Sequence, residues 1–210
     1  EEYKDRMNTR ADVDDDFDAR SLFPHEDGAF QFGFDYAYKP FSEYDFDPTT
    51  AVRNTDDTQG AYLAFNYFPL RSLSFGRLGA GLQAGATWAK FDYTSAGAQV
   101  TSRHRIESYG AKAIYEFQYF LGQIVVPHAF YGVEKIRVKN TGGVTAFPAT
   151  SFNSASYGGG AHINLNRLES SAASKALATS GVRKFYLTYT YQQRAESTGA
   201  GHFLGLRFEY

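Results

Sequence analysis

The chain has 210 residues, which suits one domain, and its aromatic content of 17%, with 16 Tyr and 19 Phe, favours strands over the composition of a helical protein. Its 21 Lys and Arg nearly balance its 23 Asp and Glu, so no overall field attracts nucleic acid, and the lack of Cys excludes disulfides, thiolate metal sites and cysteine nucleophiles. No stretch reaches the roughly 18 to 20 apolar residues of a membrane helix, whereas a transmembrane strand needs only about 9 to 11 residues, half of which can be polar.

The first 27 residues are acidic and poor in apolar side chains, as in the run from Asp12 to Asp18. The acidic spacing is similar to the start of a calcium loop, but the glycine and the closing glutamate of an EF-hand are missing at the required offsets. We therefore expect residues 1–27 to form a solvated, mobile extension. The sequence starts at Glu1 without a hydrophobic signal region, which we interpret as removal of a secretory signal.

From Gly28 onward the side chains alternate between two contrasting sets, which is the pattern of β-strands. In the first strand, Phe30 and Phe34 share one face while Gly33 and Asp35 share the other. An even number of such strands permits closure into an antiparallel barrel. The pattern predicts eight strands at about residues 28–38, 60–68, 78–91, 105–119, 125–138, 157–166, 184–192 and 203–210.

The predicted connectors mostly alternate in length. The connectors after the first, third, fifth and seventh strands are mostly long and polar, while shorter turns follow the second and fourth strands. In a membrane barrel the long connectors are extracellular and the short ones periplasmic. The connector from Arg167 to Gly181 breaks this asymmetry and could hold a short helical turn. The long segments are Lys39–Gln59, Ser95–Ser102 and Asn140–Ser154, and the shorter turns are Pro69–Phe75 and Leu121–Gln123.

The composition of the polar face bears on whether the barrel is soluble or membrane-embedded. A soluble, lipocalin-like barrel would place the apolar set inside and expose a polar set rich in Lys and Glu. Here the polar set is dominated by Gly, Asn, Gln and Thr, which suits a crowded lumen. The glycines of this set are Gly33, Gly79, Gly81, Gly85, Gly110, Gly132, Gly158, Gly160 and Gly205.

The apolar face suits a bilayer, because Ala, Leu and Val lie in the middle of the strands while Tyr and Phe gather near their ends. Hydrocarbon offers no hydrogen-bond partners, so the strands must pair with one another around a closed barrel. We predict an all-β fold: a closed antiparallel transmembrane β-barrel of about eight strands at residues 28–210, with residues 1–27 as an acidic periplasmic extension. The soluble barrel is the alternative.

This pattern resembles the eight-stranded outer-membrane family typified by the OmpA barrel domain and OmpX. The resemblance covers roughly residues 28–210 in architecture and implies a location in the bacterial outer membrane. Its most specific part is the last strand, where Leu204, Leu206, Phe208 and Tyr210 look like the signal recognised by the barrel-assembly machinery. The resemblance also implies lipopolysaccharide, the barrel-assembly machinery and a periplasmic or extracellular protein as partners.

Charged side chains on the predicted inner face nearly balance, and buried charges persist only when they are paired and hydrogen-bonded. An eight-stranded lumen is just wide enough for side chains to fill it. We therefore predict a lumen network of salt bridges, with a gated narrow conduit as the alternative. Its members are Asp35, Lys112, Glu116, Glu134, Lys184, Arg207 and Glu209.

A second set of cations lies near the predicted extracellular ends of the strands, at the height of lipopolysaccharide phosphates. Contacts with those phosphates would be charge-assisted hydrogen bonds. The alternative is that these residues only solubilise strands that protrude beyond the bilayer. The candidate contacts are Lys90, Arg103, Arg105, Lys135, Arg137 and Lys139, with Lys39 and Arg194 at the same height.

Histidines raise the question of catalysis or metal binding. His202 shares a face with the outward residues of the last strand and follows Glu196 and Ser197, but Leu204 breaks the His-x-Ser spacing of outer-membrane lipid A deacylases. His128 and His162 point inward on neighbouring strands and could pair or bind metal. No phosphate loop, metal signature or nucleophile elbow is present, so we expect no catalytic residue, metal or cofactor.

The leading hypothesis is a non-enzymatic outer-membrane barrel with a structural, envelope-integrity or loop-mediated binding role. A narrow channel or transporter for small or hydrophobic solutes is the first alternative. A lipid A-modifying hydrolase is the second.

Overall fold

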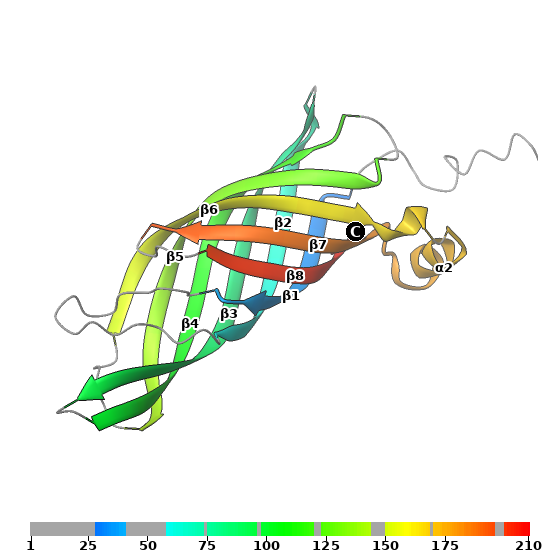
Figure 1. The fold of residues 1–210 in the computed structure, drawn as a ribbon. Helices are drawn as coiled ribbons and strands as arrows, with labels where there is room; N and C mark the ends of the chain where they lie inside the picture. The colour runs from blue at the N-terminus through cyan, green and yellow to red at the C-terminus, as the bar shows by residue number, and fades with distance from the viewer. Residues whose placement is uncertain are drawn as a thin grey trace, which may run out of the picture.

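Eight antiparallel strands close into a barrel, because β1 pairs with both β2 and β8 (Figure 1). The computed structural model describes residues 28–40, 58–73, 75–95, 98–119, 123–143, 150–168, 170–195 and 200–210. The strands are β1 (Phe30–Tyr38), β2 (Gln59–Leu73), β3 (Gly76–Ser95), β4 (Ala98–Phe117), β5 (Val125–Gly143), β6 (Thr150–Asn164), β7 (Lys184–Arg194) and β8 (Ala200–Glu209). The predicted fold of eight closed strands is confirmed.

The two faces of each strand differ as the sequence predicts. In β1 the aromatic side chains from Phe30 to Tyr38 are 44–49% exposed, while Gln31 and Asp35 are at most 2% exposed. On β2, Tyr62 and Asn66 are buried while Leu63 and Phe65 are exposed. This arrangement is the reverse of a soluble barrel, because the wall presents apolar side chains and the interior holds the polar ones. The soluble alternative is therefore excluded.

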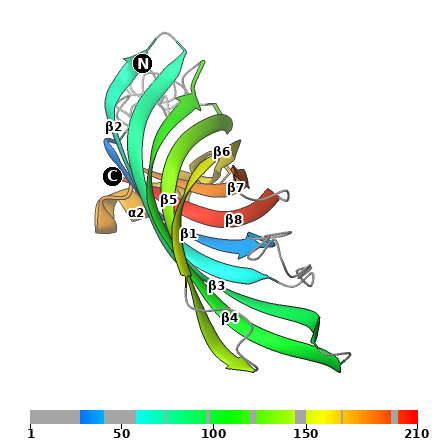
Figure 2. The same cartoon turned by 90° about the vertical axis from the view of Figure 1, so that its left-hand side faces the viewer.

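Two predicted connectors are wrong because backbone pairing continues beyond the regular alternation. The expected turn Pro69–Phe75 belongs mostly to β2, whose ladder with β3 runs through two register shifts to the pair Leu73 and Gly76. The expected loop Ser95–Ser102 is largely strand, since Ser95 pairs with Ala98. Polar residues at the ends of long strands therefore look like loops in the sequence, although they remain paired. The hairpins that they form project beyond the shorter strands (Figure 2).

The expected loop Asn140–Ser154 is also shorter than predicted, because β5 continues to Gly143 and β6 starts at Thr150. The predicted extension, residues 1–27, lies outside the described residues. So does most of the predicted loop Lys39–Gln59.

The connector after β6 contains a 3-10 turn, η1 (Leu165–Arg167), and an α-helix, α2 (Ser170–Ser180). The helix is longer than the short helical turn that the sequence predicted. It ends where Gly181 adopts φ 71°, a left-handed conformation that glycine accepts without steric cost. None of the helices in the described residues is long and apolar enough to cross a membrane.

The barrel has two distinct ends. We call the first the terminal end, because Gly28 and Tyr210 lie there and the Tyr210 N–H donates to the Phe30 carbonyl. Helix α2 is at this end, beside the C-terminus (Figure 1). We call the opposite end the hairpin end, because the long β3–β4 hairpin projects from it.

Candidate functional site in the lumen and on the outer wall

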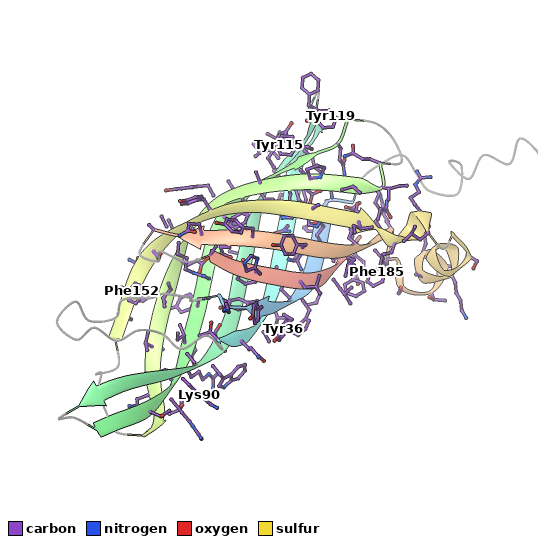
Figure 3. The ribbon with its side chains drawn as sticks, in the orientation of Figure 1. Tyr36, Lys90, Tyr115, Tyr119, Phe152 and Phe185 are labelled. Atoms are coloured by element: carbon purple, nitrogen blue, oxygen red, sulfur yellow. The ribbon has the colours of Figure 1, made fainter. Side chains whose placement is uncertain are left out.

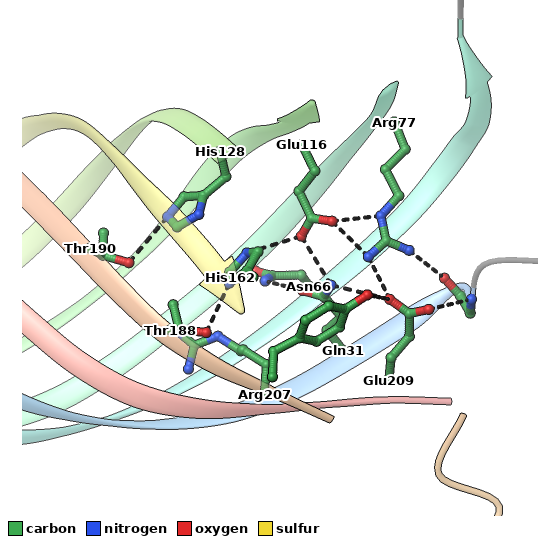
Figure 4. Close-up of polar contacts among 12 residues, drawn as sticks. Gln31, Asn66, Arg77, Glu116, His128, His162, Thr188, Thr190, Arg207 and Glu209 are labelled. Atoms are coloured by element: carbon green, nitrogen blue, oxygen red, sulfur yellow. Dashed lines mark hydrogen bonds and ion pairs between the residues drawn. The ribbon is translucent and has the colours of Figure 1, made fainter. Parts of the chain in front are cut away.

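Arg77 is the centre of a fully buried ionic cluster near the terminal end of the lumen (Figure 4). Its Nε donates to Glu116 Oε2 at 2.7 Å, and its Nη2 forms an ion pair with Glu209. All three side chains are 0% exposed. The guanidinium also lies over the Phe68 ring, 4.2 Å from the centroid. One arginine is therefore shared by two buried carboxylates, and buried charges of this kind persist only when they are paired.

Neutral and terminal groups complete the cluster around Arg77. Gln31 Nε2 donates to Glu116 Oε1 at 3.0 Å, and Gln31 Oε1 accepts from Asn66 Nδ2 at 3.2 Å. Glu209 Oε1 accepts from the Gly28 N–H at 2.9 Å and lies 3.4 Å from Lys184 Nζ. These bonds join β1, β2, β3, β4, β7 and β8 across the lumen.

A second ion pair lies between β1 and β8. Arg207 donates through Nη1 and Nη2 to the two carboxylate oxygens of Asp35, both at 2.7 Å. Pairing through two hydrogen bonds fixes the orientation of the guanidinium relative to the carboxylate and is stronger than a single bond. Gly33 leaves the space that the Arg207 side chain occupies, since a Cβ at position 33 would overlap its guanidinium.

A third ion pair lies toward the hairpin end. Arg194 donates from Nε and Nη2 to Glu134 Oε2 at 3.1 and 3.0 Å, and it also donates to the Pro40 carbonyl. Gln192 donates to the other oxygen of Glu134. Arg194 is only 2% exposed. The expectation that it faces lipopolysaccharide is wrong, because its position two residues beyond Gln192 puts its side chain on the inner face.

Between the first cluster and the hairpin end, His128 and His162 stack with ring centroids 4.2 Å apart. His128 Nε2 bonds with Thr190 Oγ1 at 3.1 Å, and His162 Nδ1 bonds with Thr188 Oγ1 at 2.8 Å. His162 Nε2 lies 3.2 Å from Glu116 Oε1. The pair is thus continuous with the Arg77 cluster. Within the described ranges no group of three or more metal-ligating side chains is arranged to hold an ion.

The structure pairs most of the charges predicted for the lumen, but it differs at Lys112. Its Nζ donates to Gln83 at 3.2 Å and lies 5.0 Å from the centre of the Phe130 ring, rather than beside a carboxylate. Arg77 is absent from the predicted network, because the sequence pattern places it between the turn Pro69–Phe75 and the third strand. Its place in the sequence does indicate an inward side chain, because Arg77 lies two residues before inward-facing Gly79 and alternate residues of a strand share a face.

The cations predicted at the extracellular ends lie on β3, β4 and β5 at the hairpin end, and Lys90 is visible there in Figure 3. Glu107 lies among them: Lys139 Nζ is 2.8 Å and Arg105 Nε 3.3 Å from its carboxylate. Glu107 lies beyond the apolar rows of the wall, and the hydrogen bond from Lys139 lowers the pKa of its carboxyl. Lys139 and Arg105 therefore both form ion pairs with Glu107.

His202 lies on the outer wall, as predicted, and its Nδ1 bonds with Tyr189 Oη at 2.8 Å. The Tyr191 ring packs edge-on at 5.8 Å. Its neighbours among the described residues are therefore aromatic. Glu196 and Ser197, which would complete a hydrolytic site, lie outside the described residues.

Closed strands, an exposed apolar wall and a buried polar lumen define an eight-stranded β-barrel of the outer-membrane type. No protein-family model matches the sequence, and no curated protein matches it. A similar solved structure is Ail, the attachment invasion locus protein of Yersinia pestis, at 12% identity and a TM-score of 0.48, covering 88% of this chain and 100% of that chain.

Two further solved structures are similar. The N-terminal β-barrel domain of Pseudomonas aeruginosa OprF has 12% identity and a TM-score of 0.46, covering 88% of this chain and 100% of that chain. Ail in a phospholipid bilayer nanodisc has 14% identity and a TM-score of 0.46, covering 87% and 99%. At these identities the likeness concerns the fold alone.

Proposed function

We propose that the protein is a non-enzymatic, non-conducting barrel that contributes to the integrity of the outer membrane. The observation that carries this proposal is the set of ion pairs centred on Arg77, Arg207 and Arg194, which occupy successive levels of the lumen. Each pair bridges different strands, so an open path for solutes would require several buried charges to separate. Separating such a pair costs about 3–5 kcal/mol when one partner is left uncompensated.

Ion conductance through the full chain in a planar lipid bilayer tests this proposal. We expect the wild-type protein to give no resolved channel steps at neutral pH. The double variant Arg194→Ala with Arg207→Ala should introduce brief openings, because it removes the ion pairs at two levels and leaves the Arg77 cluster as the remaining barrier. Lys175→Ala, on exposed α2, is the matched control and should remain closed. Steady conductance by the wild-type protein would overturn the proposal in favour of the narrow channel.

We also propose that the hairpin end is extracellular and that its outward cations contact lipopolysaccharide phosphates. The support is their position, because these cations all lie on β3–β5 toward the hairpin end. They are Lys90, Arg103, Arg105, Lys135, Arg137 and Lys139. In this orientation both ends of the described barrel at Gly28 and Tyr210 are periplasmic. The outward residues of β8 would then be the surface that the barrel-assembly machinery recognises.

The hydrolase alternative has a direct test. If the protein cleaves lipid A, His202→Ala should abolish the product, whereas His104→Ala, at a buried position on another strand, should not. Incubation of the detergent-folded chain with lipid A and mass spectrometry of the lipids measures the product. We expect none from any of these proteins.

A further inference from the structure

The outer wall over β1–β5 is hollowed where small side chains lie between larger ones. Two adjoining hollows have volumes of about 530 and 430 Å³ and share Phe65 and Leu82. Ala80, Ala111 and Ala113 form much of the floor of the larger hollow. Its sides are aromatic or branched, from Phe65 and Tyr67 on β2 and from Tyr131 and Val133 on β5. We call these two hollows the wall groove.

The strand register places cations directly beyond the wall groove toward the hairpin end. Leu82, Ala111 and Val133 form one row across β3, β4 and β5. The next row toward the hairpin end contains Ala84, Tyr109 and Lys135, and the row after that contains Ala86, Glu107 and Arg137. Consecutive rows are about 7 Å apart, because each step covers two residues of a strand.

Lys135 and Arg137 are the cations that remain available next to the groove. Both are exposed. Glu107 already accepts from Lys139, and its low pKa keeps it ionised at neutral pH, so Lys139 and Arg105 are held one row further away. Lys135 and Arg137 form no ion pair within 4 Å in the described part of the chain, which leaves two cations at the mouth of an apolar groove.

We propose that the wall groove and these two cations form one binding site for the lipid A part of lipopolysaccharide. An acyl chain occupies the groove, and a lipid A phosphate contacts Lys135 and Arg137. Tyr109 lies between the two parts and offers a hydroxyl to the sugar. This inference rests on the proposed extracellular orientation of the hairpin end, and it adds a defined acyl site to the proposed phosphate contacts.

Charge favours this occupant over a second copy of the barrel. Two copies in one membrane have the same orientation, so a symmetric contact through β3–β5 would place Lys135 and Arg137 of both copies at the same height. Like charges facing each other at close range are unfavourable. An amphiphile with an anionic head and acyl tails matches both parts of the surface without this repulsion.

The test measures binding of purified hexa-acyl, bisphosphorylated lipid A to the detergent-folded full chain by native mass spectrometry. Trp88 is the only tryptophan of the chain and lies in the row of Arg105, so its fluorescence provides a second signal. We expect Lys135→Gln with Arg137→Gln to weaken binding roughly tenfold or more, since each removes a charge-assisted hydrogen bond. Lys175→Gln is the charge control and should bind normally.

The groove is tested separately from the cations. Ala113→Phe fills its floor and should weaken binding roughly tenfold, whereas Ala161→Phe, an outward alanine on β6, should not. A heat-dependent gel shift checks folding of both variants. If Ala113→Phe does not fold, the wild-type chain is compared with hexa-acyl and tetra-acyl lipid A, and the site predicts tighter binding of the hexa-acyl form.

The outcomes separate the two proposals. Loss of binding in the double cation variant, with normal binding by Ala113→Phe and no acyl dependence, would overturn the acyl site and leave the phosphate contacts standing. No lipid A binding by the wild-type chain would overturn both. Equal affinity for phosphatidylglycerol vesicles, or for lipid A lacking phosphates, would overturn the assignment to lipid A.

Discussion

The imidazole of His162 lies between the ring of His128 and the carboxylate of Glu116, with a 4.2 Å centroid separation on one side and a 3.2 Å contact of Nε2 on the other. One proton on this pair is compensated by the carboxylate. A second proton would place two cations face to face. The geometry therefore accommodates one proton on the pair far better than two.

Acid should destabilise the folded barrel through this pair. Two protonated imidazoles repel each other at this distance only in the folded barrel, so protonation of both favours the unfolded state and stability falls as pH falls. Two unit charges 4 Å apart repel by about 4 kcal/mol at an effective dielectric of 20, and this is the order of magnitude of the repulsion between two protonated rings.

Urea unfolding of the lipid-embedded chain at pH 7.5 and pH 5 measures this effect. His128→Gln should reduce the difference in unfolding free energy between the two pH values, because it removes one of the two charges. His202→Gln, on the outer wall, should leave the difference as in the wild-type chain. Equal pH dependence in His128→Gln and wild type would count against the prediction.

Arg77→Met should lower the unfolding free energy by about 3–5 kcal/mol, because Glu116 and Glu209 then remain buried without their shared cation. The same change combined with Glu116→Gln and Glu209→Gln should recover much of that loss. Trp88 fluorescence during urea unfolding measures all three proteins. If Arg77→Met unfolds at the wild-type urea concentration, the cluster contributes no stability.

The sequence predicts the strands and their faces well because closure makes the environment of every side chain periodic. Phe34 and Asp35 are adjacent in sequence yet face the wall and the lumen, and the period of two is enough to separate them. The ends of the strands follow a different rule. Where a hairpin extends beyond the bilayer, neither face needs to be apolar. The strand residues up to the pair Ser95 and Ala98 therefore show no hydrophobic alternation by which the sequence could reveal them.

The ion pairs are harder to predict because they depend on register between distant strands. Arg77 and Glu209 are far apart in sequence, and no local pattern indicates that they meet. The face on which a residue lies can still be predicted from the sequence, and it identifies some members of the ion pairs. Arg194 shares the inner face with Gln192 and Thr190, so its position alternates inward, although its height suggested a phosphate contact.

Gly33→Ala should destabilise the barrel by about 1–3 kcal/mol, the usual cost of adding volume to a packed interior. The new methyl group would overlap the guanidinium of Arg207 and force it away from Asp35. Gly142→Ala is the matched control, since no atom lies within 4 Å of a Cβ at that position. Thermal unfolding of both variants gives the comparison, and equal midpoints would show that Arg207 can move at no cost.

Phe208 and Phe185 offer a direct test of the assembly signal proposed for β8. Their rings pack at 4.9 Å, and each is partly exposed on the outer wall, so removing either ring deletes the same aromatic contact. Phe208→Ser and Phe185→Ser should therefore have similar unfolding free energies after refolding in detergent.

In cells the two variants should differ. If Leu204, Leu206, Phe208 and Tyr210 form the signal, Phe208→Ser lacks one of its members and should give less folded barrel in the outer membrane than Phe185→Ser. The heat-dependent gel shift of membrane fractions measures the folded amount, with total protein as reference. Equal folded fractions would mean that the aromatic ring of β8 serves the contact with Phe185 and not recognition by the assembly machinery.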